Sequence, residues 1–114
     1  MERVCFTLQV RPGLLDEYRR RHAEVWPAML QEIQLSGRRN YSLFLRPDGL
    51  LVGYYETDSA SASAEYLGGS AVASRWEAEM KPFFASVAER ADHDAPRLDQ
   101  VFHLEATHAS ASIA

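Results

Sequence analysis

Apolar and polar side chains alternate along the start of the chain, a pattern typical of a half-buried β-strand. From Arg3 to Val10 every second residue is apolar. The same alternation returns over residues 39–45 and 50–56, on either side of Pro47-Asp48-Gly49, whose residue types favour a tight turn. We therefore expect one strand near the N-terminus and a β-hairpin in the middle of the chain. Residues 98–104 are expected to form the last strand.

Helical spacing of apolar residues follows the first strand. Pro12-Gly13 should turn the chain into a helix that contains Tyr18 and His22. Pro27 has no backbone N–H and disfavours helical geometry at Trp26, so a break is expected over residues 23–26. A second helix should begin at Pro27 and stop near Gly37.

Two more helices are expected after the hairpin. The first covers residues 60–66, with Ser59 as its N-cap and a stop at residues 68–69. Ser70 should cap a longer helix, whose apolar stripe comprises Val72, Trp76, Met80 and Phe83 or Phe84. Residues 88–96 read as a charged loop, and the small, polar residues 105–114 as a disordered tail.

The order of these elements is β-α-β-β-α-β, which predicts an α+β, ferredoxin-like subunit with a single domain over residues 1–104. Apolar and aromatic residues occupy both faces of several expected strands, as with Tyr54 and Tyr55. A sheet with one wet face would not need that pattern. Two subunits that pack their sheets together would explain it, so we expect a homodimer of the dimeric α/β-barrel type.

The composition of the chain limits the classes of partner and the cellular compartment that we expect. The chain has 114 residues and a formal net charge of −4, which argues against nucleic acid or an anionic membrane surface as the main partner. No apolar stretch approaches the length that spans a membrane, and no signal-peptide pattern is visible. Cys5 is the single cysteine, which excludes an internal disulfide and fits a reducing compartment. A cytoplasmic protein is expected.

Candidate chemistry lies on the first helix, where Tyr18 and His22 are one helical turn apart and should project side by side. A phenol and an imidazole beside aromatic surface could hold a hydroxylated ring and move a proton. The nearby basic run, Arg19 to Arg21, points in three directions on a helix and is expected to be solvated surface. The four histidines show no zinc-type spacing, so no metal site is expected.

Several short motifs occur in an order and spacing that cover residues 1–104. They are Arg20-Arg21-His22, Val25-Trp26-Pro27, Gly37, Asn40-Tyr41-Ser42-Leu43-Phe44-Leu45, Ser74-Arg75-Trp76 with Met80, and Val101-Phe102-His103-Leu104. In this combination the chain resembles the L-rhamnose mutarotase family. The resemblance implies a dimeric α/β-barrel that interconverts the α and β pyranose anomers of L-rhamnose or a related 6-deoxy sugar without a cofactor.

The resemblance also implies roles for individual residues. His22 matches the family's proton donor, and Tyr18 and Tyr41 match tyrosines that bind the sugar. Trp76 matches the first residue of a tryptophan pair that lines the pocket, but Glu77 stands where the second is expected. That departure bears on the identity of the sugar, since Glu77 could either accept hydrogen bonds from hydroxyls or point to solvent.

Further points stay open at this stage. Trp26 could stack on the sugar beside Trp76, and His103 replaces an aromatic residue of the family pattern. The negative end of the helix dipole favours imidazolium at His22, while the three neighbouring arginines oppose it. The second proton of the reaction could be handled by water, a tyrosine or a substrate hydroxyl.

Two other functions are alternatives to the mutarotase hypothesis. Small dimeric α/β-barrels also include cofactor-free monooxygenases and haem-degrading enzymes, a rival that rests on the fold alone. The other rival is a sugar-binding module without catalytic activity.

Overall fold

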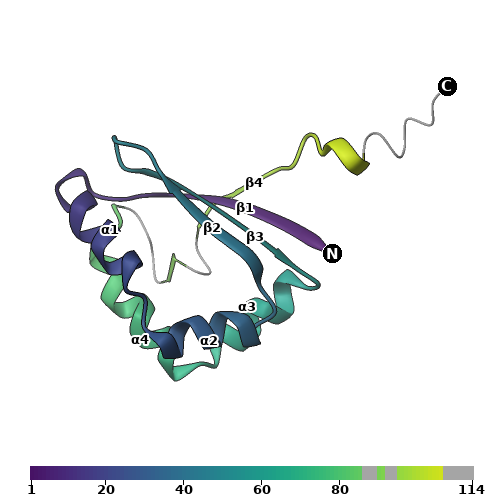
Figure 1. Cartoon of the computed structure of the whole chain (residues 1–114), viewed down its shortest axis with the longest axis horizontal. Helices are drawn as coiled ribbons and strands as arrows, with labels where there is room; N and C mark the ends of the chain where they lie inside the picture. The colour runs from purple at the N-terminus through teal and green to yellow at the C-terminus, as the bar shows by residue number, and fades with distance from the viewer. Residues whose placement is uncertain (86–89, 92–94, 107–114) are drawn as a thin grey trace.

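A computed structural model describes residues 1–85, 90, 91 and 95–106. Its core is a four-stranded antiparallel sheet with the strand order β2-β3-β1-β4, which is the ferredoxin-like order. The strands are β1 (Glu2–Gln9), β2 (Arg39–Leu45), β3 (Leu50–Thr57) and β4 (Arg97–Leu98). The helices α1 to α4 lie on one side of this sheet, which gives two layers (Figure 1). The expected α+β fold is confirmed.

The helices begin and end where local chemistry places them. They are η1 (Pro12–Leu14), α1 (Leu15–Ala23), α2 (Pro27–Leu35), α3 (Ala60–Gly68), α4 (Ala71–Met80) and η2 (Lys81–Phe83). The break between α1 and α2 is confirmed, with Pro27 in the first turn of α2. The side chains of Ser59 and Ser70 accept hydrogen bonds from the backbone N–H groups of Ala62 and Ala73, so both expected N-caps are present.

The sheet presents alternate residues of each strand to the helices. On β1 these are Val4, Phe6 and Leu8, all less than one-tenth exposed. Phe6 pairs with Gly53 of β3, and a Cβ at Gly53 would overlap the Phe6 ring. Glycine is therefore required there for the ring of Phe6 to lie flat across β3. From this position Phe6 contacts both Tyr41 and Tyr55, with ring centroids 6.3 Å away in each case.

The hairpin between β2 and β3 is as predicted. Both oxygens of Asp48 accept hydrogen bonds from Arg46, and one also accepts the N–H of Leu50. Gly49 has a φ of +96°, and a Cβ there would overlap the backbone carbonyl of Val10. Only glycine takes this conformation without strain, which explains the Pro47-Asp48-Gly49 sequence of the turn.

The expected strand over residues 98–104 is wrong. β4 contains only Arg97–Leu98, which pair with Phe6 and Cys5 of β1. Beyond Leu98 the chain leaves the edge of the sheet, and residues 104–106 form a helical turn (Figure 1). Apolar side chains along this arm are exposed, namely Val101, Phe102 and Leu104 at 94%, 63% and 59%. A strand needs a neighbour for its hydrogen bonds, and within one chain β1 provides it for two residues only.

Two other boundaries also differ from expectation or cannot be compared. α4 ends at Met80, because Pro82 follows, and both Phe83 and Phe84 are buried just beyond it. Residues 105 and 106 of the expected tail belong to the helical turn, while 107–114 lie outside the described residues. The same is true of most of the expected loop over residues 88–96.

Among the residues that the structure describes, no helix covers the second face of the sheet (Figure 1). The strand registers place Cys5, Ser42, Phe44, Val52, Tyr54 and Leu98 on this open face. Phe44 is 65% exposed and Leu98 is 52% exposed. The lone cysteine is thus half-buried on the open face and not part of the helix-covered core.

Candidate functional site

A cleft of about 1010 Å³ lies between the helices and the helix-facing side of the sheet. Its walls come from α1, α2, α4 and β2, so the break before Pro27 and the turn into β2 both shape it. Four of the residues singled out from the sequence line it: His22, Tyr41, Trp76 and Glu77. An inner recess of about 60 Å³ is lined by the same four residues together with Tyr18.

His22 is held by contacts on three sides. Its ring stacks on Tyr18 with centroids 4.1 Å apart and meets Trp76 edge-on at 5.6 Å. Its Nδ1 lies 3.0 Å from the backbone carbonyl oxygen of Tyr18, one helical turn earlier. A carbonyl oxygen only accepts hydrogen bonds, so Nδ1 carries the proton and donates it. In neutral His22 the Nε2 atom is therefore the free base.

Burial decides the charge of His22. It lowers the pKa of the imidazole below the ordinary value of 6.5, and the hydrogen bond to the Tyr18 carbonyl opposes this only in part. From the sequence, the helix dipole and the neighbouring arginines were expected to act on the pKa of His22 in opposite directions. The largest cause of the lowered pKa is instead burial of the imidazole by tertiary packing, to which Trp76 contributes.

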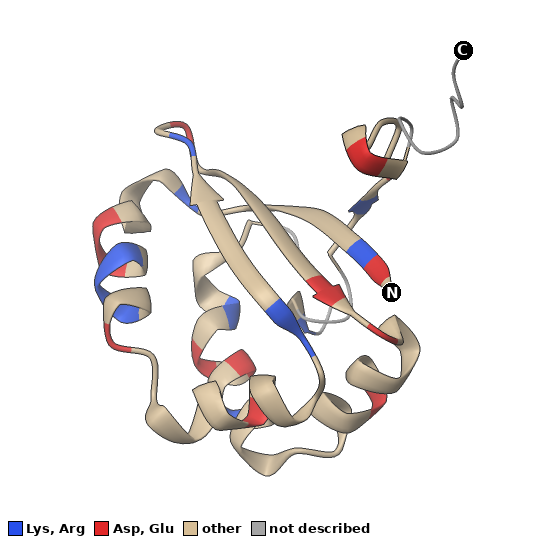
Figure 2. Cartoon of the chain, turned by 45° about the vertical axis from the view of Figure 1, so that its right-hand side comes forward, with Lys and Arg blue, Asp and Glu red and all other residues tan. Residues whose placement is uncertain are grey.

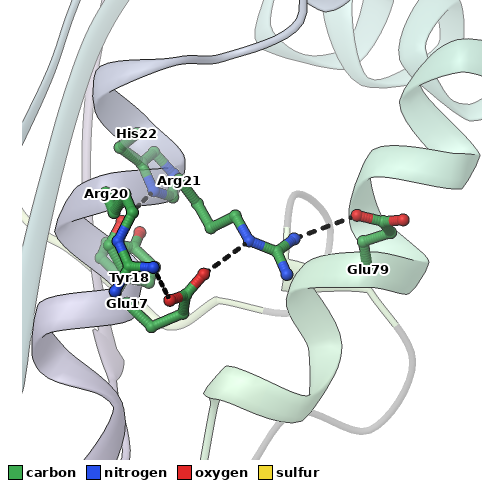
Figure 3. Close-up of polar contacts among 6 residues, drawn as sticks. All are labelled: Glu17, Tyr18, Arg20, Arg21, His22 and Glu79. Atoms are coloured by element: carbon green, nitrogen blue, oxygen red, sulfur yellow. Dashed lines mark hydrogen bonds and ion pairs between the residues drawn. The ribbon is translucent and has the colours of Figure 1, made fainter.

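Arg19, Arg20 and Arg21 are neutralised by carboxylates on the outside of the protein. The acidic residues lie in the first turn of α1 and the basic residues follow them (Figure 2), so that Arg19 pairs with Asp16 and Arg20 with Glu17. Arg21 donates to Glu17 at 3.0 Å and to Glu79 of α4 at 3.1 Å, which ties α1 to α4 beside His22 (Figure 3). The basic run is solvated, ion-paired surface, in agreement with the prediction.

Tyr18 is a buried phenol, 4% exposed. Burial, with smaller electrostatic contributions from Tyr41 and Glu77, raises the pKa of the Tyr18 hydroxyl well above its usual value. The group thus stays protonated throughout the physiological range. It can donate and accept hydrogen bonds, but it is a poor proton source.

Tyr41 belongs to a stacked column of side chains at the cleft wall. Its ring stacks on Tyr55 at 5.3 Å with an interplanar angle of 23°. On the other side of Tyr55, the guanidinium carbon of Arg38 lies 4.2 Å from the ring centroid. The column fixes the orientation of Tyr41, which both faces the cleft and packs against the core.

The two tryptophans have different positions. Trp76 is 8% exposed and forms part of the cleft wall. Trp26 meets Trp76 edge-on at 5.1 Å and is not among the residues that line the cleft. Glu77 is buried and lines the cleft, which favours the sequence interpretation in which it faces a ligand over the one in which it points to solvent.

Sequence reasoning missed Arg38. It is 4% exposed and lines the cleft, whereas the adjacent Arg39 is exposed and paired with Asp58. Two successive arginines at the start of a strand look alike in the sequence, and only the alternation of the strand hints that one points inward. His103, the other departure from the family pattern, accepts a hydrogen bond from the Ala106 N–H in the C-terminal arm, away from the residues that line the cleft.

In residues 1–85, 90, 91 and 95–106, no three histidine, cysteine, aspartate or glutamate side chains are grouped so that they could hold a metal ion. Within the same ranges, no helix has both the length and the apolar character required to cross a bilayer.

Known proteins agree with this picture. A family model described as L-rhamnose mutarotase matches residues 3–104. L-rhamnose mutarotases from Oceanobacillus iheyensis and Pectobacterium atrosepticum are 33% and 36% identical, and each alignment covers 92% of this chain and 100% of the relative. The crystal structure of an L-rhamnose mutarotase from Formosa agariphila has a TM-score of 0.74 and 20% identity, covers 91% of this chain and 99% of its own, and shares the fold. The chain belongs to the L-rhamnose mutarotase family of carbohydrate isomerases.

Proposed function

We propose that the protein interconverts the α and β pyranose anomers of L-rhamnose or a closely related 6-deoxy sugar, with His22 as the acid/base group and without a cofactor. The proposal rests on family membership together with one geometric observation. The Nδ1 atom of His22 is occupied by the Tyr18 carbonyl, and the ring lines a cleft large enough for a monosaccharide.

Mutarotation opens a cyclic hemiacetal to the free aldehyde and closes it on the other face. Opening removes a proton from the anomeric hydroxyl and adds one to the ring oxygen. Both oxygens are bonded to the anomeric carbon, so a base beside that carbon is close to both. Rotation about the adjacent C–C bond then presents the other face of the aldehyde, and ring closure reverses the two proton transfers.

His22 suits this exchange because its lowered pKa keeps the imidazole neutral at pH 7. Neutral Nε2 accepts the anomeric proton, and the imidazolium formed returns a proton to oxygen. The inner recess of about 60 Å³ supports water as the carrier of the second proton, since a recess of about 10–15 Å³ by this measure already holds one water. Tyr18 is a weaker choice for that role because of its raised pKa.

The remaining cleft residues would bind the sugar. The hydroxyls of Tyr18 and Tyr41 can both donate and accept hydrogen bonds, as sugar hydroxyls require. Trp76 offers an apolar surface for the C–H face of the ring and for the methyl of a 6-deoxy sugar. Glu77 would accept hydrogen bonds from hydroxyls, and Trp26 would support Trp76 from outside the lining.

Exchange spectroscopy of the anomeric protons tests this proposal. Cross-peaks between the two anomers of L-rhamnose should appear at times when the uncatalysed reaction gives none, and a parallel series on L-fucose ranks the sugars. No acceleration on either sugar, with binding retained, would favour a non-catalytic sugar-binding module. A haem-related enzyme would instead change the absorption spectrum of added haem, which we do not expect from a member of this family.

We also propose that the active species is a homodimer in which the open faces of two sheets pack together. The exposed Phe44 and Leu98 on that face support this proposal. Light scattering after size-exclusion chromatography should give twice the chain mass, and Phe44→Glu should give the monomer. Leu35→Glu is the matched control, because Leu35 is 59% exposed at the end of α2 on the helical side. A monomeric wild-type protein would refute the dimer.

A cytoplasmic location completes the proposal and is supported by the single free cysteine, Cys5. Fractionation of source cells would test it, and recovery with an extracytoplasmic fraction would contradict it.

A further inference from the structure

The guanidinium of Arg38 is buried at the cleft without a complete set of partners. Its Nε donates to the Ser63 hydroxyl at 3.1 Å, and its face stacks on Tyr55. Its Nη2 is buried and finds no hydrogen-bond acceptor among the residues that the structure describes. The same part of the chain supplies no carboxylate within ion-pairing distance of Arg38, although Asp58 pairs with the neighbouring Arg39.

A buried guanidinium with an unpaired N–H group has a cost in free energy. Buried donors are nearly always paired, and an ionised side chain removed from water needs hydrogen bonds to its charge. Arginine cannot avoid the cost by losing its proton. Because Arg38 lines the cleft, an acceptor on a bound ligand is a direct way to complete its hydrogen bonds.

The buried carboxyl group of Glu77, which lines the same cleft, indicates the kind of ligand. Its electrostatic interaction with Tyr18 is one cause of the raised pKa of that hydroxyl. Arg38 offers only donors and an ionised Glu77 only acceptors, while a sugar hydroxyl can do both. A neutral polyhydroxylated ring suits the two together. A sugar carboxylate would suit Arg38 but be repelled by Glu77.

We propose that Arg38 is a sugar-binding residue whose terminal N–H groups donate to one ring hydroxyl of a neutral monosaccharide and thereby help to select it. This inference rests on the proposed function, because it assumes a sugar in the cleft. Since His22 acts at the anomeric carbon, Arg38 donates its hydrogen bond to a different hydroxyl of the sugar. Tyr41, which is linked to Arg38 through Tyr55, belongs to the same side of the binding site.

The test is a double-mutant cycle between protein and sugar. L-rhamnose and its 2-, 3- and 4-deoxy analogues are titrated into wild-type protein, Arg38→Met and Arg38→Lys. Tryptophan fluorescence reports binding, because both tryptophans of the chain lie at or behind the cleft wall. Anomer exchange gives KM and kcat separately. Arg46→Met is the control, since Arg46 is exposed and bonded to Asp48 in the hairpin turn.

Arg38→Met should raise the Kd for L-rhamnose about 10- to 100-fold, the range for a lost hydrogen bond to a charged group, with kcat changed less than about threefold. One deoxy analogue should bind wild-type protein as weakly as L-rhamnose binds Arg38→Met. That same analogue should suffer no additional loss in the variant. Arg38→Lys should fall between wild type and Arg38→Met, because lysine keeps a donor but not the planar fork. The control should bind like wild type.

Other results would overturn the inference. Equal deoxy penalties in wild type and Arg38→Met would mean that Arg38 touches no hydroxyl, as would an unchanged Kd. Tighter binding of D-glucuronate than of L-rhamnose, lost in Arg38→Met, would show a carboxylate site instead. Circular dichroism checks folding, and if Arg38→Met does not fold, the cycle is completed with Arg38→Lys. Intact binding without anomer exchange would refute the mutarotase proposal while leaving the Arg38 cycle measurable.

Discussion

His22 and Arg38 line the same cleft and are both shielded from water, and burial has opposite consequences for their charge. His22 responds to burial by a lowered pKa, so it is neutral at pH 7. Arg38 is more deeply buried but keeps its charge, because a guanidinium does not lose its proton in proteins. A side chain that can discharge is suited to exchange protons, and one that cannot is suited to hold a ligand. With the roles proposed here, the cleft would separate chemistry from binding through the choice of side chain.

Their surroundings match this division. Aromatic rings enclose His22, with Tyr18 on its face and Trp76 at its edge, and its one hydrogen bond leaves Nε2 available. Arg38 also stacks on an aromatic ring, that of Tyr55, but among the described residues its hydrogen-bond partner is the hydroxyl of Ser63.

Removal of His22 should have the largest effect. His22→Ala should slow anomer exchange by about 10²- to 10⁴-fold, the usual range for loss of a general acid/base, because the variant lacks the imidazole that is proposed to take the anomeric proton. Exchange spectroscopy measures the rate, and thermal unfolding should show little change because His22 is only half-buried. Retained exchange would remove His22 from its role.

A change of pH should separate the proposed catalytic role of His22 from the proposed binding role of Arg38. A neutral Nε2 is needed, so kcat/KM should be constant at and above neutral pH and fall tenfold per pH unit once the pH drops below the lowered pKa of His22. The bend should therefore lie below pH 6.5. The Kd for sugar, set by the permanently charged Arg38, should stay nearly constant across that bend. A Kd that rises in parallel with the loss of rate would contradict the separation.

Loss of the Tyr41 hydroxyl should act on binding more than on chemistry. Tyr41→Phe should raise the Kd for L-rhamnose about 2- to 10-fold, as expected for one neutral hydrogen bond, while kcat changes less. The ring and its stack on Tyr55 are kept, so the fold should not suffer. A larger fall in kcat than in affinity would place Tyr41 in the proton transfer.

Loss of the Ser63 hydroxyl should produce the smallest change in activity. Ser63→Ala removes the acceptor of the Arg38 Nε–H and should lower the free energy of unfolding by about 1–3 kcal/mol, the cost of a buried unpaired donor. Urea unfolding measures this loss. Affinity for sugar should fall only a few-fold, since the terminal N–H groups remain. Unchanged stability would mean that the Arg38–Ser63 hydrogen bond contributes little.

Features governed by local chemistry could be predicted from the sequence. The break before Pro27, the serine caps and the turn at Gly49 each depend on a few adjacent residues, and all are present. The pairing of Tyr18 with His22 follows from helical spacing and is also observed.

Features that depend on distant contacts could not be predicted. The pKa of His22 is set by burial under groups that include Trp76 of a later helix, and no local pattern reports that cover. The burial of Arg38 depends on Tyr55 and Ser63 in the same way. The apolar arm after Leu98 looked like a strand because its composition suits one, but composition does not supply a partner strand.

The bond between His22 Nδ1 and the carbonyl of Tyr18 has an evolutionary consequence. A main-chain acceptor is present whatever side chain occupies position 18, so the tautomer of the imidazole does not depend on the side chain of any other residue. Mutational drift can alter the sugar-contacting residues without disturbing which nitrogen is basic. For an enzyme designer, a single helical turn ending in histidine is thus a transplantable unit, provided that the host scaffold shields its ring from water.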